Sequence, residues 1–383
     1  MADTATQSGI SASSDASNAI ELTVIIPTFN EVDNVAPLLE KLTTALSGLR
    51  WEAVFVDDDS SDGTHLAVAE AAKSVANVRL IRRIGRRGLS TAVIEGALSS
   101  LARFVAVIDG DMQHDETKLV EMLNELRAGK DLAVGTRYAG DGGTGDWDET
   151  RENVSRLATR LAKLVTGTHL SDPMSGFFMI RREAFEASMR RLSGQGFKIL
   201  LDIVASAPKP LEIVEVPYVF QSRQFGESKL DSMVAVEYAM LLIDKTIGNV
   251  IPVRFFMFSL VGGLGLFVHM AVLTSAHQLA DASFAVAQAT ATIVAMGFNF
   301  FLNNMLTYRD KRLKGLRDVF VGLISFYLVC SLGAVANVGV ANFMFEKDYA
   351  WWLSGVAGVL VGAVWNYAAT SVFTWGGKKK TAH

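Results

Sequence analysis

Hydrophobic and polar positions follow two different patterns along this chain, and the change falls near residue 250. Before that point, short apolar runs alternate with stretches in which apolar residues recur at helical spacing, as in Val35, Leu38, Leu39, Leu42 and Leu46. The runs read as strands at 22–26, 51–56, 78–81 and 104–108. This alternation predicts an α/β domain built on a mostly parallel sheet, with helices at about 64–76 and 90–101.

The same pattern continues to about residue 220. We expect strands at 132–138 and 212–220, a turn leading into a strand over 171–180, and helices over 150–166 and from 196 onward. Pro217 is tolerable only at a sheet edge or a bulge. The glycine-rich stretch 139–146 is typical of a mobile loop over a substrate.

After residue 250 four long apolar segments follow, at 255–275, 284–306, 319–343 and 351–375. Each is long enough to cross about 30 Å of hydrocarbon as a helix. Basic residues gather between the second and third segments and after the fourth, whereas the other two loops offer only Lys347. The positive-inside rule therefore places both termini and residues 1–250 in the cytoplasm, at the inner face of a cell membrane.

An internal repeat links the two halves of this membrane region. Phe298-Asn299-Phe300 recurs as Trp365-Asn366-Tyr367, and Thr307-Tyr308 recurs as Thr374-Trp375. The repeat predicts two related helical hairpins. The polar side chains Asn299, Asn303, Asn304 and Asn366 indicate interhelical hydrogen bonds or, as the alternative, a substrate pathway. Gly358-x-x-x-Gly362 allows close helix contact within the chain or in a homo-oligomer.

Composition narrows the class of protein. The chain of 383 residues carries a formal net charge of −4, which argues against nucleic acid as a partner. Cys330 is the only cysteine, so no intrachain disulfide forms. Residues 1–20 read as a disordered leader rather than a signal peptide, and 232–250 as an amphipathic helix at the membrane face.

Candidate chemistry lies where the predicted strands end. The apolar run 104–108 stops at Asp109-Gly110-Asp111, and two other strands end near Glu31 and Asp58. Ligands of open α/β sheets bind at this edge, usually nucleotides, and paired carboxylates suit Mg²⁺ or Mn²⁺. A polar turn is the alternative for the acidic pair. The arginine-rich loop 82–88 fits a solvated loop or a phosphate-facing one equally well.

Seven motifs follow one another along the first part of the chain. They are Val24-Ile25-Ile26-Pro27-Thr28-Phe29-Asn30-Glu31, Val56-Asp57-Asp58-Asp59-Ser60-Ser61-Asp62-Gly63-Thr64, Asp109-Gly110-Asp111-Met112-Gln113-His114, Gly135-Thr136-Arg137-Tyr138, Ser175-Gly176-Phe177-Phe178, Gly196-Phe197-Lys198-Ile199-Leu200 and Gly226-Glu227-Ser228-Lys229-Leu230. Together they resemble the dolichyl (polyprenyl) phosphate mannose synthases of inverting glycosyltransferase family 2. The resemblance covers about residues 21–230 and is specific, because many motifs agree in order and spacing. Residues 253–377 resemble the GtrA-like four-helix membrane domain.

The resemblance implies a Rossmann-like GT-A fold and assigns roles to individual residues. The nucleotide positions are Pro27, Phe29, Glu31, Val56, Asp58 and Asp109, with Arg223 and Lys229 on a closing loop. The metal and diphosphate positions are Asp109, Asp111 and Gln113, and the lipid-phosphate positions are Arg137, Arg151 and Ser155. The implied domains are a leader 1–20, a transferase domain 21–230, interfacial helices 231–252, a transmembrane domain 253–377 and a basic tail 378–383.

Three positions depart from the family pattern. Phe29 stands where Tyr is usual, Gly110 where Ala is usual, and His114-Asp115-Glu116 replaces His-Pro-Pro. The first two preserve shape, whereas the third puts the timing of the loop beside the metal in doubt.

The implied activity is metal-dependent, inverting transfer of a sugar, with GDP-mannose favoured as donor, to a polyprenyl phosphate in the bilayer. A UDP-sugar-dependent polyprenyl-phosphate glucosyltransferase is an alternative, because the nucleoside motifs do not distinguish guanine from uracil. A lipid-linked sugar flippase or carrier is a second alternative, motivated by the membrane repeat.

Overall fold

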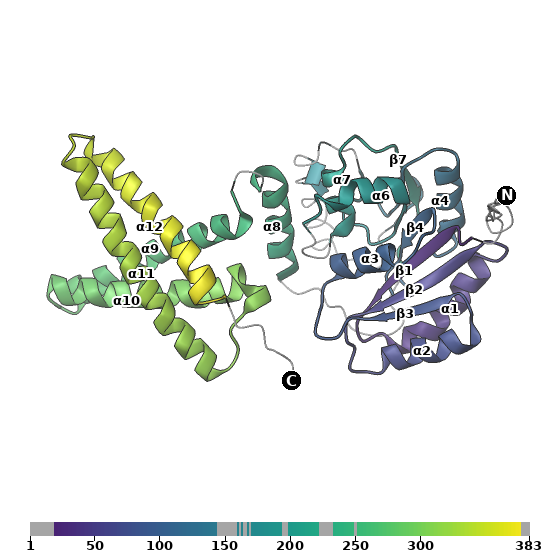
Figure 1. Cartoon of the computed structure of the whole chain (residues 1–383), viewed down its shortest axis with the longest axis horizontal. Helices are drawn as coiled ribbons and strands as arrows, with labels where there is room; N and C mark the ends of the chain where they lie inside the picture. The colour runs from purple at the N-terminus through teal and green to yellow at the C-terminus, as the bar shows by residue number, and fades with distance from the viewer. Residues whose placement is uncertain are drawn as a thin grey trace, which may run out of the picture. The chain divides into compact units, whose positions relative to one another are not determined.

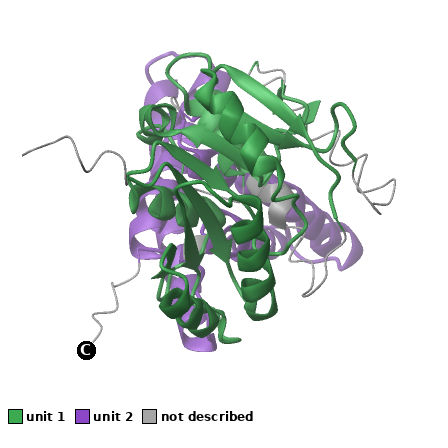
Figure 2. Cartoon of the chain, turned by 90° about the vertical axis from the view of Figure 1, so that its right-hand side faces the viewer, with its two compact units in different colours: residues 1–246 green, residues 247–383 purple. Residues whose placement is uncertain are grey.

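The computed structural model describes residues 19–143, 159–160, 162–163, 167, 170–193, 198–221, 233–248 and 251–376. The chain divides into two compact units, residues 1–246 and 247–383, which Figure 2 colours separately. Each unit is considered by itself.

The first unit is built on a seven-stranded sheet in the order β3-β2-β1-β4-β6-β5-β7 (Figure 1). β1, β2, β3 and β4 run parallel, β7 runs parallel to β5, and β6 runs antiparallel to both β4 and β5. The predicted mostly parallel sheet is therefore confirmed. The strands are β1 (Leu22–Thr28), β2 (Trp51–Asp57), β3 (Val78–Arg82), β4 (Phe104–Val107), β5 (Leu132–Thr136), β6 (Phe178–Arg181) and β7 (Ile213–Pro217).

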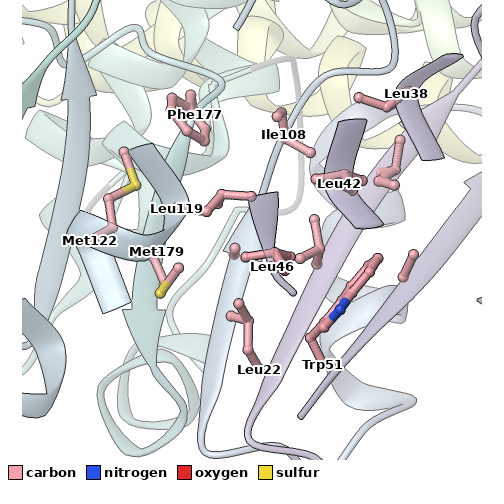
Figure 3. Close-up of a cluster of buried hydrophobic side chains, with 14 of the residues drawn as sticks. Leu22, Leu38, Leu42, Leu46, Trp51, Ile108, Leu119, Met122, Phe177 and Met179 are labelled. Carbon is pink, nitrogen blue, oxygen red and sulfur yellow. The ribbon is translucent and has the colours of Figure 1, made fainter. Parts of the chain in front are cut away.

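Helices cover both faces of this sheet, because the central strands are apolar on both sides and need burial on both. One face carries α1 (Val32–Ala45), α2 (Thr64–Ser74) and α4 (Lys118–Arg127). The other carries α3 (Leu89–Leu98), α6 (Arg182–Met189) and α7 (Ile199–Ser206). Figure 3 shows part of the first cluster, to which α1 contributes Leu38 and Leu42, the residue after α1 contributes Leu46, and β1 contributes Leu22.

The last residues of β5 and β7 fix the positions of Arg137 and Pro217. β5 ends at Thr136, so Arg137 lies just beyond the strand rather than within it. β7 is an edge strand and ends at Pro217, where the missing N–H of proline costs no ladder hydrogen bond, as the sequence predicted.

α8 (Met233–Ile247) packs on the first unit. Its Tyr238 and Leu241 are buried against Leu201 of α7. Lys245 Nζ lies 2.5 Å from the carboxylate of Asp202, which is fully buried. Tyr238 and Leu241, two apolar residues expected on one face of this helix, are thus directed toward the first unit.

The second unit consists of four helices long and apolar enough to cross a membrane. They span Val253–Leu279, Phe284–Thr307, Leu316–Phe345 and Trp351–Phe373. The first joins α9 (Val253–Thr274) to the π-helical turn η1 (Ser275–Leu279), and the second joins α10 (Phe284–Leu302) to η2 (Asn303–Thr307). The 3₁₀ turn η3 (Arg309–Lys311) leads to α11 (Leu316–Phe345), and α12 (Trp351–Phe373) follows.

The two hairpins, α9–α10 and α11–α12, make matching contacts at positions 67 or 68 apart. Phe258 meets Tyr367 with ring centroids 5.9 Å apart, and their counterparts Phe326 and Phe300 meet at 5.8 Å. Tyr308 stacks directly on its own counterpart Trp375, at 4.1 Å and 6° between planes. Because equivalent residues of the repeats meet there, the stack lies on the pseudo-twofold axis. The structure thus agrees with the hairpin repeat predicted from the sequence.

The asparagine side chains of this unit are held by contacts within and between its helices. Asn304 Oδ1 accepts hydrogen bonds from Trp375 Nε1 at 3.1 Å and from Leu313 N at 2.9 Å. Asn303 Oδ1 accepts one from the Thr307 hydroxyl at 2.7 Å. Asn299 and Asn366 instead press against Gly265 and Gly333, where any Cβ would collide with the amide group. These contacts favour the packing interpretation over a substrate pathway.

Candidate functional site

Three neighbouring strands, β2, β1 and β4, end side by side in polar turns. Each turn contains a non-glycine residue with a left-handed backbone: Asn30 at φ 55°, Asp59 at φ 57° and Met112 at φ 57°. Such conformations each cost on the order of 1 kcal/mol or more and cluster at functional sites. The convergence predicted from the acidic strand ends is present.

The acidic pair follows β4 directly. Asp111 is 9% exposed, and its Oδ1 accepts a hydrogen bond from Gln113 N at 3.2 Å. Asp109 packs against Gly176, where an added Cβ would lie 2.6 Å from Asp109 Oδ2. The Ser175-Gly176 turn therefore fits against the carboxylate only because residue 176 has no side chain.

This donor set suits a hard divalent cation that is shared with a substrate. Among the described residues, no group of three or more His, Cys, Asp or Glu side chains is placed to hold a metal. Mg²⁺ characteristically binds through one or two carboxylates together with substrate phosphates and water. Asp109, Asp111 and Gln113 fit that arrangement rather than an all-protein cage.

His114 is buried beneath this loop. Its ring stacks on Phe177 at 5.3 Å, and its Nδ1 accepts a long hydrogen bond from Asp109 N at 3.4 Å. Burial lowers the pKa of His114 to about 4; Asp111 and Asp172 oppose the shift and Arg137 adds to it. The neutral ring therefore acts as a packed support for the acidic loop.

Arg137 lies beside the acidic loop, paired with a carboxylate that sequence reasoning did not single out. Its Nε and Nη2 donate to the two oxygens of Asp172 at 2.7 and 2.9 Å. Asp172 is fully buried and Arg137 is 9% exposed. Burial opposes the charge of Arg137, but the hydrogen bond with Asp172 outweighs it, so the pKa of Arg137 is raised.

The family resemblance assigns five residues to nucleoside binding, and they lie on β1, β2 and the turns after these strands. Pro27 and Val56 are direct register partners in the sheet. Asp58 accepts hydrogen bonds from Arg83 Nη1 at 2.5 Å and from Gly88 N at 2.7 Å. Asp58 therefore fixes the arginine-rich loop in addition to bordering the site.

Two further members of this set are held by their neighbours. The guanidinium of Arg87 lies 4.2 Å from the centroid of the Phe29 ring. Glu31 Oε2 accepts a hydrogen bond from Asn34 Nδ2 at 2.7 Å. Of the four arginines in the loop, Arg82, Arg83 and Arg86 pair with carboxylates, and Arg87 covers the aromatic ring.

Four predicted site residues lie outside the described part of the chain: Arg151, Ser155, Arg223 and Lys229. The segment leading to Arg223 is nevertheless tied to the acidic loop. Gln113 Nε2 donates to Gln221 O at 3.0 Å, and Gln221 N donates to Gln113 O at 2.9 Å.

Sequence reasoning missed Asp172, and it also missed the carboxylates that shape the turns, buried Asp57 and exposed Asp62. Asp57 accepts from the backbone and hydroxyl of Ser60 at 3.0 and 2.5 Å. Asp62 accepts from Val32 N at 3.1 Å, which links the turns after β1 and β2. The only available signal for Asp57 and Asp62 was their position within a quoted motif, and Asp172 lies just before another.

Comparison with known proteins agrees with this architecture. The family described as Glycosyl transferase family 2 matches residues 23–188, and the GtrA/DPMS transmembrane domain matches residues 257–375. A dolichol-phosphate mannosyltransferase from Pyrococcus furiosus is 32% identical over 93% of this chain and 99% of its own length. One from Saccharomyces cerevisiae is 36% identical over 58% of this chain and 86% of its own.

Among solved structures, glucosyl-3-phosphoglycerate synthase from Mycobacterium tuberculosis in complex with Mn²⁺, UDP-glucose and phosphoglyceric acid is similar with a TM-score of 0.48 and 16% identity. That similarity covers 60% of this chain and 80% of the synthase.

The fold, the sheet-edge site and the apolar helices thus define a membrane-bound family 2 glycosyltransferase with a GtrA-like transmembrane domain. Similarity to the Pyrococcus furiosus relative extends over nearly the whole of both chains. The chain belongs to the dolichol-phosphate mannosyltransferase family.

Proposed function

We propose that this protein transfers mannose from GDP-mannose to a polyprenyl phosphate at the cytoplasmic face of the membrane, with inversion at the anomeric carbon. The observation that carries the proposal is the carboxylate pair after β4 beside the Arg137–Asp172 pair, in a chain that matches a dolichol-phosphate mannosyltransferase end to end. The four apolar helices supply the bilayer attachment that such an acceptor requires.

The donor binds at the ends of β1, β2 and β4. Pro27, Phe29, Glu31, Val56 and Asp58 border the nucleoside, and Asp109, Asp111 and Gln113 face the diphosphate together with Mg²⁺ or Mn²⁺. Such a cation, when bound, offsets negative charge on the departing diphosphate. Gly110 keeps this loop close to β1, since a Cβ there would lie 3.2 Å from Thr28 Cγ2.

The acceptor needs no general base. A phosphate monoester has a second pKa of about 6, so a polyprenyl phosphate is largely dianionic near neutral pH and can attack the anomeric carbon directly. The task of the protein is to hold two anionic substrates in line. Arg137, Arg151 and Ser155 hold the acceptor phosphate, and Arg223 and Lys229 close over the donor.

Orientation follows from the basic loops. Arg309, Lys311, Arg312, Lys314 and Arg317 lie between the second and third spans, and Lys378, Lys379 and Lys380 follow the fourth. The positive-inside rule assigns these segments, and with them the transferase unit, to the cytoplasm.

A donor panel tests the proposal. The purified full-length protein is incubated in vesicles with a polyprenyl phosphate and labelled GDP-mannose, UDP-glucose or other GDP and UDP sugars. We expect a labelled glycolipid from GDP-mannose above all others. Product from a UDP sugar alone would identify a polyprenyl-phosphate glucosyltransferase instead, and absence of product from every donor would favour a flippase or carrier.

A further inference from the structure

Lys198 is a cation at this site that has no role in the proposed function described above. It is half-buried and immediately precedes α7. Its Nζ donates to the backbone oxygen of Met174 at 3.4 Å. Among the described residues no carboxylate forms an ion pair with it within 4.0 Å.

The neighbouring arginines present much less net charge to a substrate. Arg137 is paired through two hydrogen bonds with Asp172, and Arg83 with Asp58. Each of these buried cations sits beside a full negative charge, so each pair is close to neutral as a unit. A phosphate dianion that must approach a second anion needs a positive charge that is not already balanced.

Lys198 is hydrogen bonded to the turn that also carries the partner of Arg137. Its partner Met174 belongs to the same turn as Asp172, and that turn packs Gly176 against Asp109. The pKa of Lys198 is lowered, mainly by burial and also by the charge of Arg137, although the charges of Asp109 and Asp172 act to raise it. The ammonium group thus lies within the electrostatic field of all three side chains.

We propose that Lys198 binds the phosphate group of the polyprenyl phosphate acceptor, supplying the uncompensated positive charge beside the Arg137–Asp172 pair. This inference rests on the proposed function. Asp109 and Asp111 would hold the divalent cation that counters the donor diphosphate. The acceptor phosphate is a dianion, and of the two arginines assigned to it Arg137 is already paired with Asp172 and Arg151 lies outside the described residues, so a further cation beside Arg137 strengthens its binding. An ammonium group has three donors, and the structure uses one of them on Met174 O.

The test compares Lys198→Met, which keeps the length of the side chain and removes its charge, with Lys198→Arg. Lys130→Met is the matched control, because Lys130 is an exposed lysine that precedes β5 and pairs with Glu212 at 3.4 Å. For Lys198→Met we expect the KM for polyprenyl phosphate to rise by about tenfold to a hundredfold, the loss expected for one charge-assisted hydrogen bond. The KM for the donor should stay within about twofold of the wild-type value, because the interaction is made with the acceptor only.

Lys198→Arg should retain most of the acceptor affinity, and Lys130→Met should match the wild type. A rise confined to the donor KM would overturn the inference and assign Lys198 to the donor diphosphate. Unchanged values for both substrates would also overturn it. Circular dichroism and thermal melting verify folding; if Lys198→Met does not fold, Lys198→Gln takes its place.

A binding measurement separates this inference from the proposed function. Vesicles with and without polyprenyl phosphate are titrated with the wild type and with Lys198→Met, in the absence of any donor. Weaker binding by the variant only to vesicles that contain the lipid phosphate supports the inference, even if the wild type transfers no sugar from any donor tested. Equal binding by both proteins contradicts it.

Discussion

At the scale of single residues, Arg137 combines a proposed role in substrate binding with an observed structural one. We propose that it binds the acceptor phosphate, and it is also the partner of a fully buried carboxylate, Asp172. Removing one member of a buried ion pair leaves the other charged and desolvated, whereas replacing both is often tolerated.

Arg137→Leu alone should therefore lower the free energy of unfolding by about 3–5 kcal/mol, the usual cost of a buried charge without its partner. Arg137→Leu combined with Asp172→Leu should regain most of that loss, yet acceptor affinity should remain poor in both variants. Denaturant titration and acceptor KM measure the two effects separately. If the double variant recovered normal acceptor affinity, Arg137 would have only a structural role.

The candidate site residues that the sequence predicts are those whose neighbours in the chain point to them. Asp109 and Asp111 stand out because they end an apolar strand, and Phe29 and Asp58 because they follow others. Lys198 belongs to a quoted motif and Asp172 lies just before another, but the contacts of both depend on partners brought close by folding: Arg137 lies 35 residues from Asp172, and Met174 lies 24 from Lys198. No local pattern specifies such pairings.

At the scale of elements, buried polar contacts hold strands in register with their neighbours. Glu52 of β2 accepts hydrogen bonds from Thr23 of β1 at 2.8 Å and from Arg79 of β3 at 2.7 Å. Burial alone would raise the pKa of Glu52, but the hydrogen bonds from Arg79, Ser100 and Thr23 outweigh it and lower the pKa below 4.5.

Because the folded pKa lies below the unfolded one, Glu52 stabilises the fold above about pH 4.5, and this contribution disappears as the pH falls through the folded pKa. At pH 7, Glu52→Gln should reduce the free energy of unfolding by about 1 kcal/mol. The effect is this small because Arg79 is partly exposed, so solvent screens its interaction with Glu52. The difference from the wild type should vanish as the pH falls through the pKa of Glu52 in the folded protein. Denaturant titrations across pH measure it, with Glu70→Gln, on an exposed pair with Lys73, as a control that should show no such difference.

The hairpin repeat makes a second prediction at this scale. Gly265 and Gly333 occupy equivalent positions and face Asn299 and Asn366, so a methyl group at either should overpack its hairpin by about 1–3 kcal/mol. Gly265→Ala and Gly333→Ala should lower the melting temperature in detergent to a similar extent. Gly263→Ala and Gly339→Ala, where a Cβ would meet nothing within 4 Å, are the controls. A loss at only one of the two sites would contradict equivalent packing in the hairpins.

Element boundaries were predicted well where periodicity was strong and poorly where it was weak. The four apolar segments and the strands that became β1 to β4 appear within a few residues of expectation. The antiparallel direction of β6 was not predicted, since an apolar run carries no information about strand direction. Likewise, the amphipathic pattern of α8 could not reveal that Tyr238 and Leu241 pack on α7.

At the scale of the whole molecule, charge asymmetry between loops predicts orientation in the membrane. The only native cysteine, Cys330, is buried in α11, so a Cys330→Ser background allows single cysteines to be placed at will. In intact cells, an impermeant maleimide should label Lys347→Cys and leave Lys314→Cys unlabelled until the membrane is opened. Labelling of Lys314→Cys in intact cells would reverse the orientation and place the transferase unit outside.

We propose that the two carboxylates after β4 direct cation-dependent sugar transfer to a lipid phosphate. The most direct measurement follows glycolipid formation from GDP-mannose by the wild type, Asp109→Asn and Asp111→Asn, with Mg²⁺ or Mn²⁺ and after chelation by EDTA. We expect transfer by the wild type to stop in EDTA and to return with added cation, and both variants to remain folded but lose about a hundredfold or more in rate. Full transfer in EDTA, or full activity in either variant, would contradict the account.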